Sequence, residues 1–194
     1  MDEIGAWADK NFTTHWPDYG IVEEIGEIVH CVLKRAQGIR GFDKDEVYAA
    51  GLKDSFADLM IYLLHLCYKY KVALSFDSYK TWVSDRMSDR MAIHQLLRHA
   101  GLLMEYSEIA CISDNNPLFR VPAQAVCNIA IIWGNQLGID VIEATRDEWE
   151  NNVRKRDWQA NKEDADIKAR EIKLQDPDLK AKVDEWQHKL DELK

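Results

Sequence analysis

Two short groups of acidic residues stand at helical spacing and together could bind a metal ion. Glu24 and Glu27 are three residues apart, and Asp54 and Asp58 are four apart. Side chains at these spacings share one face of a helix. If two such helices pack side by side, their carboxylates meet, and carboxylate oxygens are ligands that Mg²⁺ prefers. With a phosphate bound, such a cluster can hold metal ions that polarise the phosphoryl group and activate water.

The surroundings of the two acidic groups differ. In the first helix, Glu23 and Glu27 lie opposite a stripe of isoleucines, which is also the pattern of a solvated face. In the second helix, residues 59–64 are apolar on every side, which is typical of a buried helix. An aspartate beside such a run is rarely buried without a partner. The pattern therefore favours a functional role most strongly for Asp58.

The order of these acids resembles the MazG-like all-α nucleoside triphosphate pyrophosphohydrolases, a superfamily that includes the all-α dUTPases and dCTPases. The family pattern is Glu-Glu-x-x-Glu followed by Glu-x-x-Asp. Glu24, Glu27 and Asp58 match the metal ligands of that pattern. Ser55 stands where the family usually has Glu, and Asp54, one residue earlier, is the candidate to replace it.

The resemblance, which covers about residues 16–90, implies a reaction. A nucleoside triphosphate would be hydrolysed to a monophosphate and pyrophosphate by attack of water on the α-phosphorus. Mg²⁺, or Mn²⁺ in its place, would be held by Glu24, Glu27, Asp54 and Asp58. The first two and Asp58 would be the catalytic residues. The implied role is housekeeping of the nucleotide pool.

Basic and aromatic residues near the acidic groups are candidates for binding this substrate. Positive charge would neutralise the outer phosphates, and aromatic rings can stack on a base. The basic candidates are Lys34, Arg35, Arg40, Arg154 and Lys155, the last two in a segment, residues 150–158, that is similar to the family's Asn- and Arg-containing C-terminal helix. The candidates for base stacking are His15 and Trp16, although core packing or a surface contact is the more common role of such a tryptophan.

Nearly the whole chain has the apolar spacing of α-helices, which predicts an all-α antiparallel helical bundle. The low counts of glycine and proline, 9 and 4 in 194 residues, also favour long regular elements. We expect helices over residues 18–36, 45–70, 76–90, 91–112, 122–137 and 141–158.

The acidic groups recur later in the chain in a degenerate form. Glu105 and Glu108 repeat the first group, whereas Gln124 and Asn128 stand in the places of the two aspartates. Amides lack the charge that attracts Mg²⁺. We therefore expect an active copy over about residues 16–90 and an inactive copy over about residues 95–158, related by a pseudo-twofold axis.

The two MazG-like copies define a domain over residues 1–158, and a charged helical extension follows over residues 159–194. Leucine, valine and tryptophan residues in this extension form a short heptad-like stripe from Leu179 to Leu193. Such a stripe fits packing on the chain's own domain or contact with another copy. We expect a homo-oligomer, and a dimer in the first instance.

Composition excludes several classes of protein. With 25 Lys and Arg against 34 Asp and Glu, the net charge of −9 argues against binding a nucleic-acid polymer. The acidic N terminus lacks the pattern of a signal peptide, and the longest apolar run is far too short for a membrane span. The four cysteines show no C-x-x-C spacing, which is typical of free thiols in a reducing compartment. These features predict a cytoplasmic protein without a membrane partner.

Two other functions remain open on the sequence. A non-catalytic helical scaffold derived from the family would explain Ser55 and the degenerate second copy. A di-iron carboxylate bundle is suggested by the Glu-x-x-His motif at residues 27–30, because ferritin-like bundles use two such motifs. The other one here, at residues 185–188, falls in the charged extension rather than in an expected core helix.

Overall fold

The computed structural model describes residues 2–12, 16–81, 87–110 and 117–156, and every regular element in them is helical. The chain divides into two units, Met1–Arg156 and Asp157–Lys194. The second unit, which includes the predicted extension and its heptad-like stripe, lies outside the described residues. The α-helices are α1 (Asp2–Asn11), α2 (Pro17–Gln37), α3 (Asp45–Lys69), α4 (Asp89–Ala110), α5 (Pro117–Gln136) and α6 (Val141–Asn151), and the short 3₁₀ helices are η1 (Ser78–Thr81) and η2 (Val153–Lys155).

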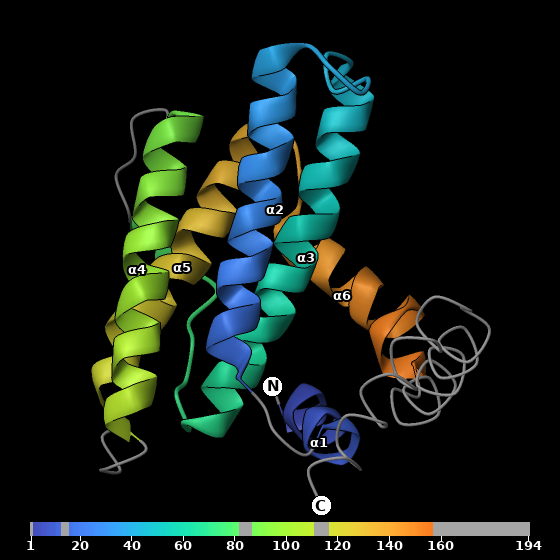
Figure 1. Ribbon diagram of the computed structural model, residues 1–194. Helices are drawn as coiled ribbons and strands as arrows, with labels where there is room; N and C mark the ends of the chain where they lie inside the picture. Colours follow the sequence, from blue (N-terminus) through green and yellow to red (C-terminus); the bar gives the residue numbers. More distant parts are fainter. Residues whose placement is uncertain (1, 13–15, 82–86, 111–116, 157–194) are drawn as a thin grey trace, which may run out of the picture. The chain divides into compact units, whose positions relative to one another are not determined.

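The four long helices form two antiparallel pairs that pack against each other (Figure 1). Helix α2 pairs with α3 and α4 pairs with α5, and contacts of α2 with α4 and of α3 with α5 join the two pairs. Helix α3 is also covered by α1 and α6. The all-α bundle predicted from the sequence is confirmed. Each predicted copy contains one helix pair, and their pseudo-twofold relation stays a prediction.

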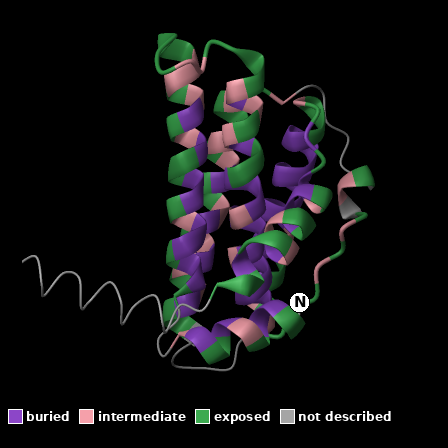
Figure 2. Cartoon of the chain, turned by 90° about the vertical axis from the view of Figure 1, so that its right-hand side faces the viewer, coloured by how far each residue is buried: buried purple, intermediate pink, exposed green. Residues whose placement is uncertain are grey.

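Helix α3 is the central element of the bundle. Its residues 59–64 are buried except for Tyr62, which is half-buried, as the apolar run predicts. Buried residues continue along the inner faces of α2 and α5, so that one apolar core runs through the bundle (Figure 2). Within the described residues, no single helix has both the length and the apolar composition needed to cross a membrane.

Helix α2, which carries the first acidic group, has well-defined ends. Pro17 occupies its first turn, where the missing N–H is not needed. Gly38 ends it in the left-handed conformation at φ 63°, and its N–H donates to the carbonyl of Arg35. This is the backbone conformation that glycine adopts without a steric penalty. Glu24 and Glu27 therefore stand in the interior of a rigid helix rather than at a frayed end.

The structure corrects the helix predicted over residues 76–90. After α3 the chain runs without regular structure to the 3₁₀ turn Ser78–Thr81, and α4 begins only at Asp89. The side-chain amide of Gln124 accepts from the backbone N–H of Ser75 and donates to its carbonyl, both at 2.8 Å. These hydrogen bonds satisfy the backbone of Ser75, just before the predicted helix, and local helical periodicity cannot reveal them.

One further helix and two helix boundaries also differ from the prediction. Helix α1 was missed, although its Ile4 packs with Ile61, Leu64 and Trp149 in a second small core. Helix α5 begins at Pro117, so that Pro122 lies inside it rather than in its first turn. Helix α6 ends at Asn151 and not at residue 158. Helix α1 was not predicted because it is short and is stabilised by tertiary contacts rather than by its own sequence.

Candidate metal centre

The antiparallel pairing of α2 and α3 brings the predicted acidic groups together. Glu24 faces α3 and is only 7% exposed. The pKa of Glu24 is raised to about 8, first by burial and then by the charges of its acidic neighbours, which are, in order of strength, Asp58, Glu27, Glu23 and Asp54. The four acids predicted from helical spacing thus interact in one cluster, as expected for two helices packed side by side.

The carboxylate of Glu24 is the most unusual group in this cluster. Its Oε2 is buried and has no hydrogen-bond partner among the described residues. Burying a polar atom without a partner is costly, and buried polar atoms in proteins are nearly always paired. A cation bound among the carboxylates would supply the missing interaction, since it attracts the charged form that burial disfavours.

Asp58 of α3 is half-buried. Its pKa is raised to about 6, first by burial and then by nearby charges, of which that of Glu148 in α6 has the largest effect. Asp54 and Glu27 act in the same direction, whereas Arg156 lowers the pKa of Asp58. Sequence analysis missed Glu148. Its signal is its position four residues after the buried Ala144 and three after the buried Thr145, which places an acid on the inward face of α6.

An open pocket of about 510 Å³ lies beside the cluster, between α2 and α3. Gly26 of α2 and Gly51 of α3 line it without side chains. Acidic, imidazole, thiol and hydroxyl groups line the rest. The lining residues are Glu23, Gly26, Glu27, His30, Cys31, Gly51, Asp54 and Ser55. The exposed carboxylates of the cluster therefore face a space that admits solvent and a small ligand.

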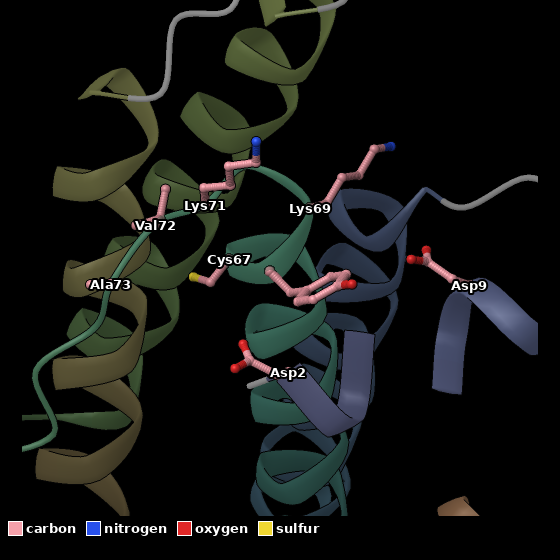
Figure 3. Close-up of a pocket in the computed structure, with 8 residues that line it drawn as sticks. Asp2, Asp9, Cys67, Lys69, Lys71, Val72 and Ala73 are labelled. Carbon is pink, nitrogen blue, oxygen red and sulfur yellow. The ribbon is translucent and has the colours of Figure 1, made fainter. Parts of the chain in front are cut away.

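A second pocket, of about 540 Å³, lies at the opposite end of α3 (Figure 3). Asp2 and Asp9 of α1 line one side of it, and Lys69 and Lys71 belong to the end of α3 and the turn that follows. This pocket contains none of the clustered acids, and it mixes both signs of charge. We therefore place the candidate site at the smaller pocket, where the carboxylates are.

Ser55 does not take the place of the carboxylate that the family pattern has there. It is 3% exposed, and its hydroxyl donates to the carbonyl of Gly51 at 3.0 Å, one turn back along α3. Asp54 is exposed and lines the pocket together with Glu27. Asp54 is thus at the rim of the cluster, whereas Glu24 is buried and Asp58 is half-buried.

Two of the predicted phosphate-binding arginines are paired with acidic residues outside the cluster. Arg35 binds Asp45 at 2.6 Å and lies 4.4 Å from the centre of the Tyr48 ring. Arg154 pairs with Glu150 at 2.7 Å. These two guanidinium groups are engaged with residues outside the cluster.

Arg156, which follows the predicted Lys155, does reach the cluster. It lies 3.8 Å from Glu148 and acts on Asp58. Lys155 and Arg40 are exposed, and Arg40 belongs to the turn after α2 at φ 60°.

The remaining predicted substrate residues lie apart from the buried acids. Lys34 is half-buried two turns after Glu27 in α2. Trp16 is 66% exposed, and its ring lies 5.5 Å from that of Tyr19. His15 falls outside the described residues. The exposed Trp16–Tyr19 pair thus offers an aromatic surface at the start of α2.

The amides of the second copy serve the fold. Gln124 donates to the side chain of Asn128 at 3.0 Å in addition to its two bonds to Ser75. Asn128 is 1% exposed, in the core of the bundle. Glu105 and Glu108 are exposed on α4.

The donor chemistry of the cluster fits a hard divalent cation. All the clustered side chains offer carboxylate oxygens, and one of these oxygens is buried without a partner. In the described part of the chain, no three His, Cys, Asp or Glu side chains converge closely enough to hold a metal ion as they stand. Binding would therefore require the carboxylates to move towards the cation.

Comparison of the chain with models of protein families, with curated proteins and with solved structures finds no match. The candidate site is therefore defined by its own residues and their surroundings.

Proposed function

We propose that this protein is a nucleoside triphosphate pyrophosphohydrolase that depends on Mg²⁺ or Mn²⁺. It would convert a ribo- or deoxyribonucleoside triphosphate and water to the monophosphate and pyrophosphate. The observation that carries the proposal is the buried Glu24 carboxylate, whose unpartnered oxygen lies among four other acids beside an open pocket. The order of these acids along the chain, which resembles the MazG-like enzymes, selects the reaction.

In this proposal helices α2 and α3 provide the acidic ligands of the cation, and the open pocket between them provides access for the substrate. Glu24, Glu27 and Asp58 would hold the cation, which supplies positive charge to the phosphates and polarises the α-phosphoryl group. Helices α2 and α3 fix the backbone of these three residues within one packed core. The pocket beside Glu27 and Asp54 would admit the triphosphate. Arg156 is a basic side chain whose charge acts on one of these acids, because it lowers the pKa of Asp58.

Release of pyrophosphate from a panel of nucleoside triphosphates in the presence of Mg²⁺ tests the reaction. We expect turnover of one or a few nucleotides. Asp58→Asn should lower kcat by at least about 100-fold, because it removes a ligand from the ion that stabilises the transition state. Asp77→Asn is the matched control, since Asp77 is exposed and pairs with Lys80 at 2.6 Å. Equal turnover by the Asp58 and Asp77 variants would contradict the proposal.

The scaffold alternative is favoured by one observation. Ser55 donates to the backbone, so the position of the fourth family carboxylate offers no ligand. If the protein turns over none of the nucleotides, with Mg²⁺ or with Mn²⁺, the scaffold function is the one to pursue.

A further inference from the structure

The outer face of helix α4 carries charges that are separated by sign along the helix. Helix α4 lies at one edge of the bundle, and its main contacts are with α2 and α5 (Figure 1). The exposed ionisable residues in its first half are all basic, and those in its second half are all acidic. They are Arg90, His94 and Arg98, followed by Glu105 and Glu108. In the described part of the chain, none of these five side chains forms an ion pair.

This order of charges does not stabilise α4 itself. A helix is stabilised by acidic groups near its N terminus and by basic groups near its C terminus. Arg90 is the second residue of α4 and Glu108 is in its last turn, so both charges oppose this preference. Like charges three or four residues apart also repel each other, as Glu105 and Glu108 do here. A second α4 running in the opposite direction would place opposite charges side by side, so the face is complementary to itself.

The surface between the two groups of charges permits close contact. Gly101 is exposed, and nothing lies within 4 Å of the Cβ that another residue would have there. Leu97, four residues earlier, is 46% exposed, and Met104, three residues later, is half-buried. At these spacings both side chains lie beside the glycine on the helix surface. A second helix can therefore approach the backbone at Gly101 closely while it covers apolar side chains.

We propose that two copies of this protein associate through α4, with the two α4 helices antiparallel and Gly101 at the twofold axis. A twofold axis makes each contact occur twice, because both copies present the same surface. The pairs formed between the copies are Arg98 with Glu105, His94 with Glu108 and Leu97 with Met104. The inference is independent of the proposed reaction, because α4 carries none of the proposed cation ligands.

Sedimentation velocity of the full chain over a series of protein concentrations tests this interface. We expect the parent to form a dimer. Arg98→Glu should weaken association by at least about 10-fold, because two ion pairs become two repulsions between like charges. Glu105→Arg should do the same for the same reason. The double variant Arg98→Glu/Glu105→Arg should recover most of the affinity, because it exchanges the two charges of each pair.

Lys10→Glu is the matched control for the change in charge. Lys10 is exposed on α1, whose main contacts are with α3, so this variant should associate as the parent does. A parent protein that is monomeric at every concentration overturns the inference. A dimer that resists both single substitutions forms through another surface, for which the stripe from Leu179 to Leu193 is the candidate, and also overturns it. Weakening by both single substitutions without recovery in the double variant overturns the antiparallel pairing.

Gly101→Gln separates association from folding. Glutamine favours a helix more than glycine does, and the position is open within one copy, so the variant should stay folded. Its side chain would occupy the space that the second helix needs, and association should weaken by at least about 10-fold. Circular dichroism measures the helix content, and sedimentation measures association. A folded Gly101→Gln protein that dimerises as strongly as the parent overturns the proposal.

Discussion

The buried carboxylate of Glu24 opposes folding when no cation is present. Burial and four acidic neighbours disfavour its charged form, and its Oε2 has no partner among the described residues. Such arrangements are retained at functional sites, where groups with strongly perturbed pKa values cluster. Glu24 is therefore the residue at which stability and function are expected to conflict most directly.

This conflict predicts how stability depends on pH. The pKa of Glu24 in the folded protein, about 8, lies above its ordinary value of 4.5. Stabilisation from its protonation is therefore complete below about pH 4.5 and is lost as the pH rises through about 8. Asp58, with a pKa of about 6, acts in the same direction. We expect the Tm of the metal-free protein to fall by roughly 5 °C between about pH 6 and about pH 9.

Glu24→Gln provides the comparison for this prediction, measured by thermal unfolding in the presence of a chelator. Glutamine resembles the protonated acid and cannot ionise, so the variant should lose less stability over the same pH range. An equally steep fall in the parent and in Glu24→Gln would show that other groups cause the pH dependence.

At the scale of the helices, the site depends on how closely α2 approaches α3. Gly20 permits this approach, because a Cβ at that position would enter the ring of Tyr62. Tyr62 in turn lies close enough to Glu24 and Asp58 for their charges to raise its pKa, after the larger effect of burial. The absence of one side chain in α2 thus sets the spacing beside the buried acids.

Two glycine substitutions in the same helix test this packing. Gly20→Ala should destabilise the fold by about 1–3 kcal/mol, because the added methyl group overfills the interface with Tyr62. Gly26→Ala should stabilise it by about 0.5–1 kcal/mol, since nothing lies within 4 Å of the added Cβ and alanine favours the helix. Urea denaturation measures both. Similar effects of the two substitutions would contradict the role given to Gly20.

At the scale of the whole molecule, negative charge gathers in the candidate site and is also in excess over the entire chain. The net charge of −9 includes the acids of α2, α3 and α6 whose charges act on Glu24 and Asp58. A cation bound there would relieve repulsion between separate helices and thereby stabilise the entire bundle. Assembly into a homo-oligomer stays a prediction, as does the role of the extension outside the described residues.

Saturating Mg²⁺ should therefore raise the Tm of the protein at pH 8. A ligand at 100 times its Kd adds about 2.7 kcal/mol to the free energy of unfolding. For a domain of this size that corresponds to about 5–10 °C. Differential scanning calorimetry with and without Mg²⁺ measures the shift, and Asp58→Asn should abolish most of it. A shift of the same size in Asp58→Asn would place the bound ion elsewhere.

The helical class, the buried run at residues 59–64 and the shared faces of Glu24 with Glu27 and of Asp54 with Asp58 follow from the sequence alone. Helical periodicity is a local property, and it determines which side chains point the same way on one element. The N-cap of α6 also depends only on neighbouring residues, because the side chain of Asp140 accepts a hydrogen bond from the N–H of Glu143 at 3.0 Å.

Only the tertiary structure decided which faces meet. It brought Glu148 and Arg156 to Asp58, although these residues are remote in sequence from both acidic groups. It also replaced the helix predicted over residues 76–90 by irregular chain and the 3₁₀ turn Ser78–Thr81, which follow the point where Gln124 binds the backbone of Ser75. Contacts between distant residues depend on how helices pack and on hydrogen bonds between them, and neither is encoded in the spacing of residues along a single helix.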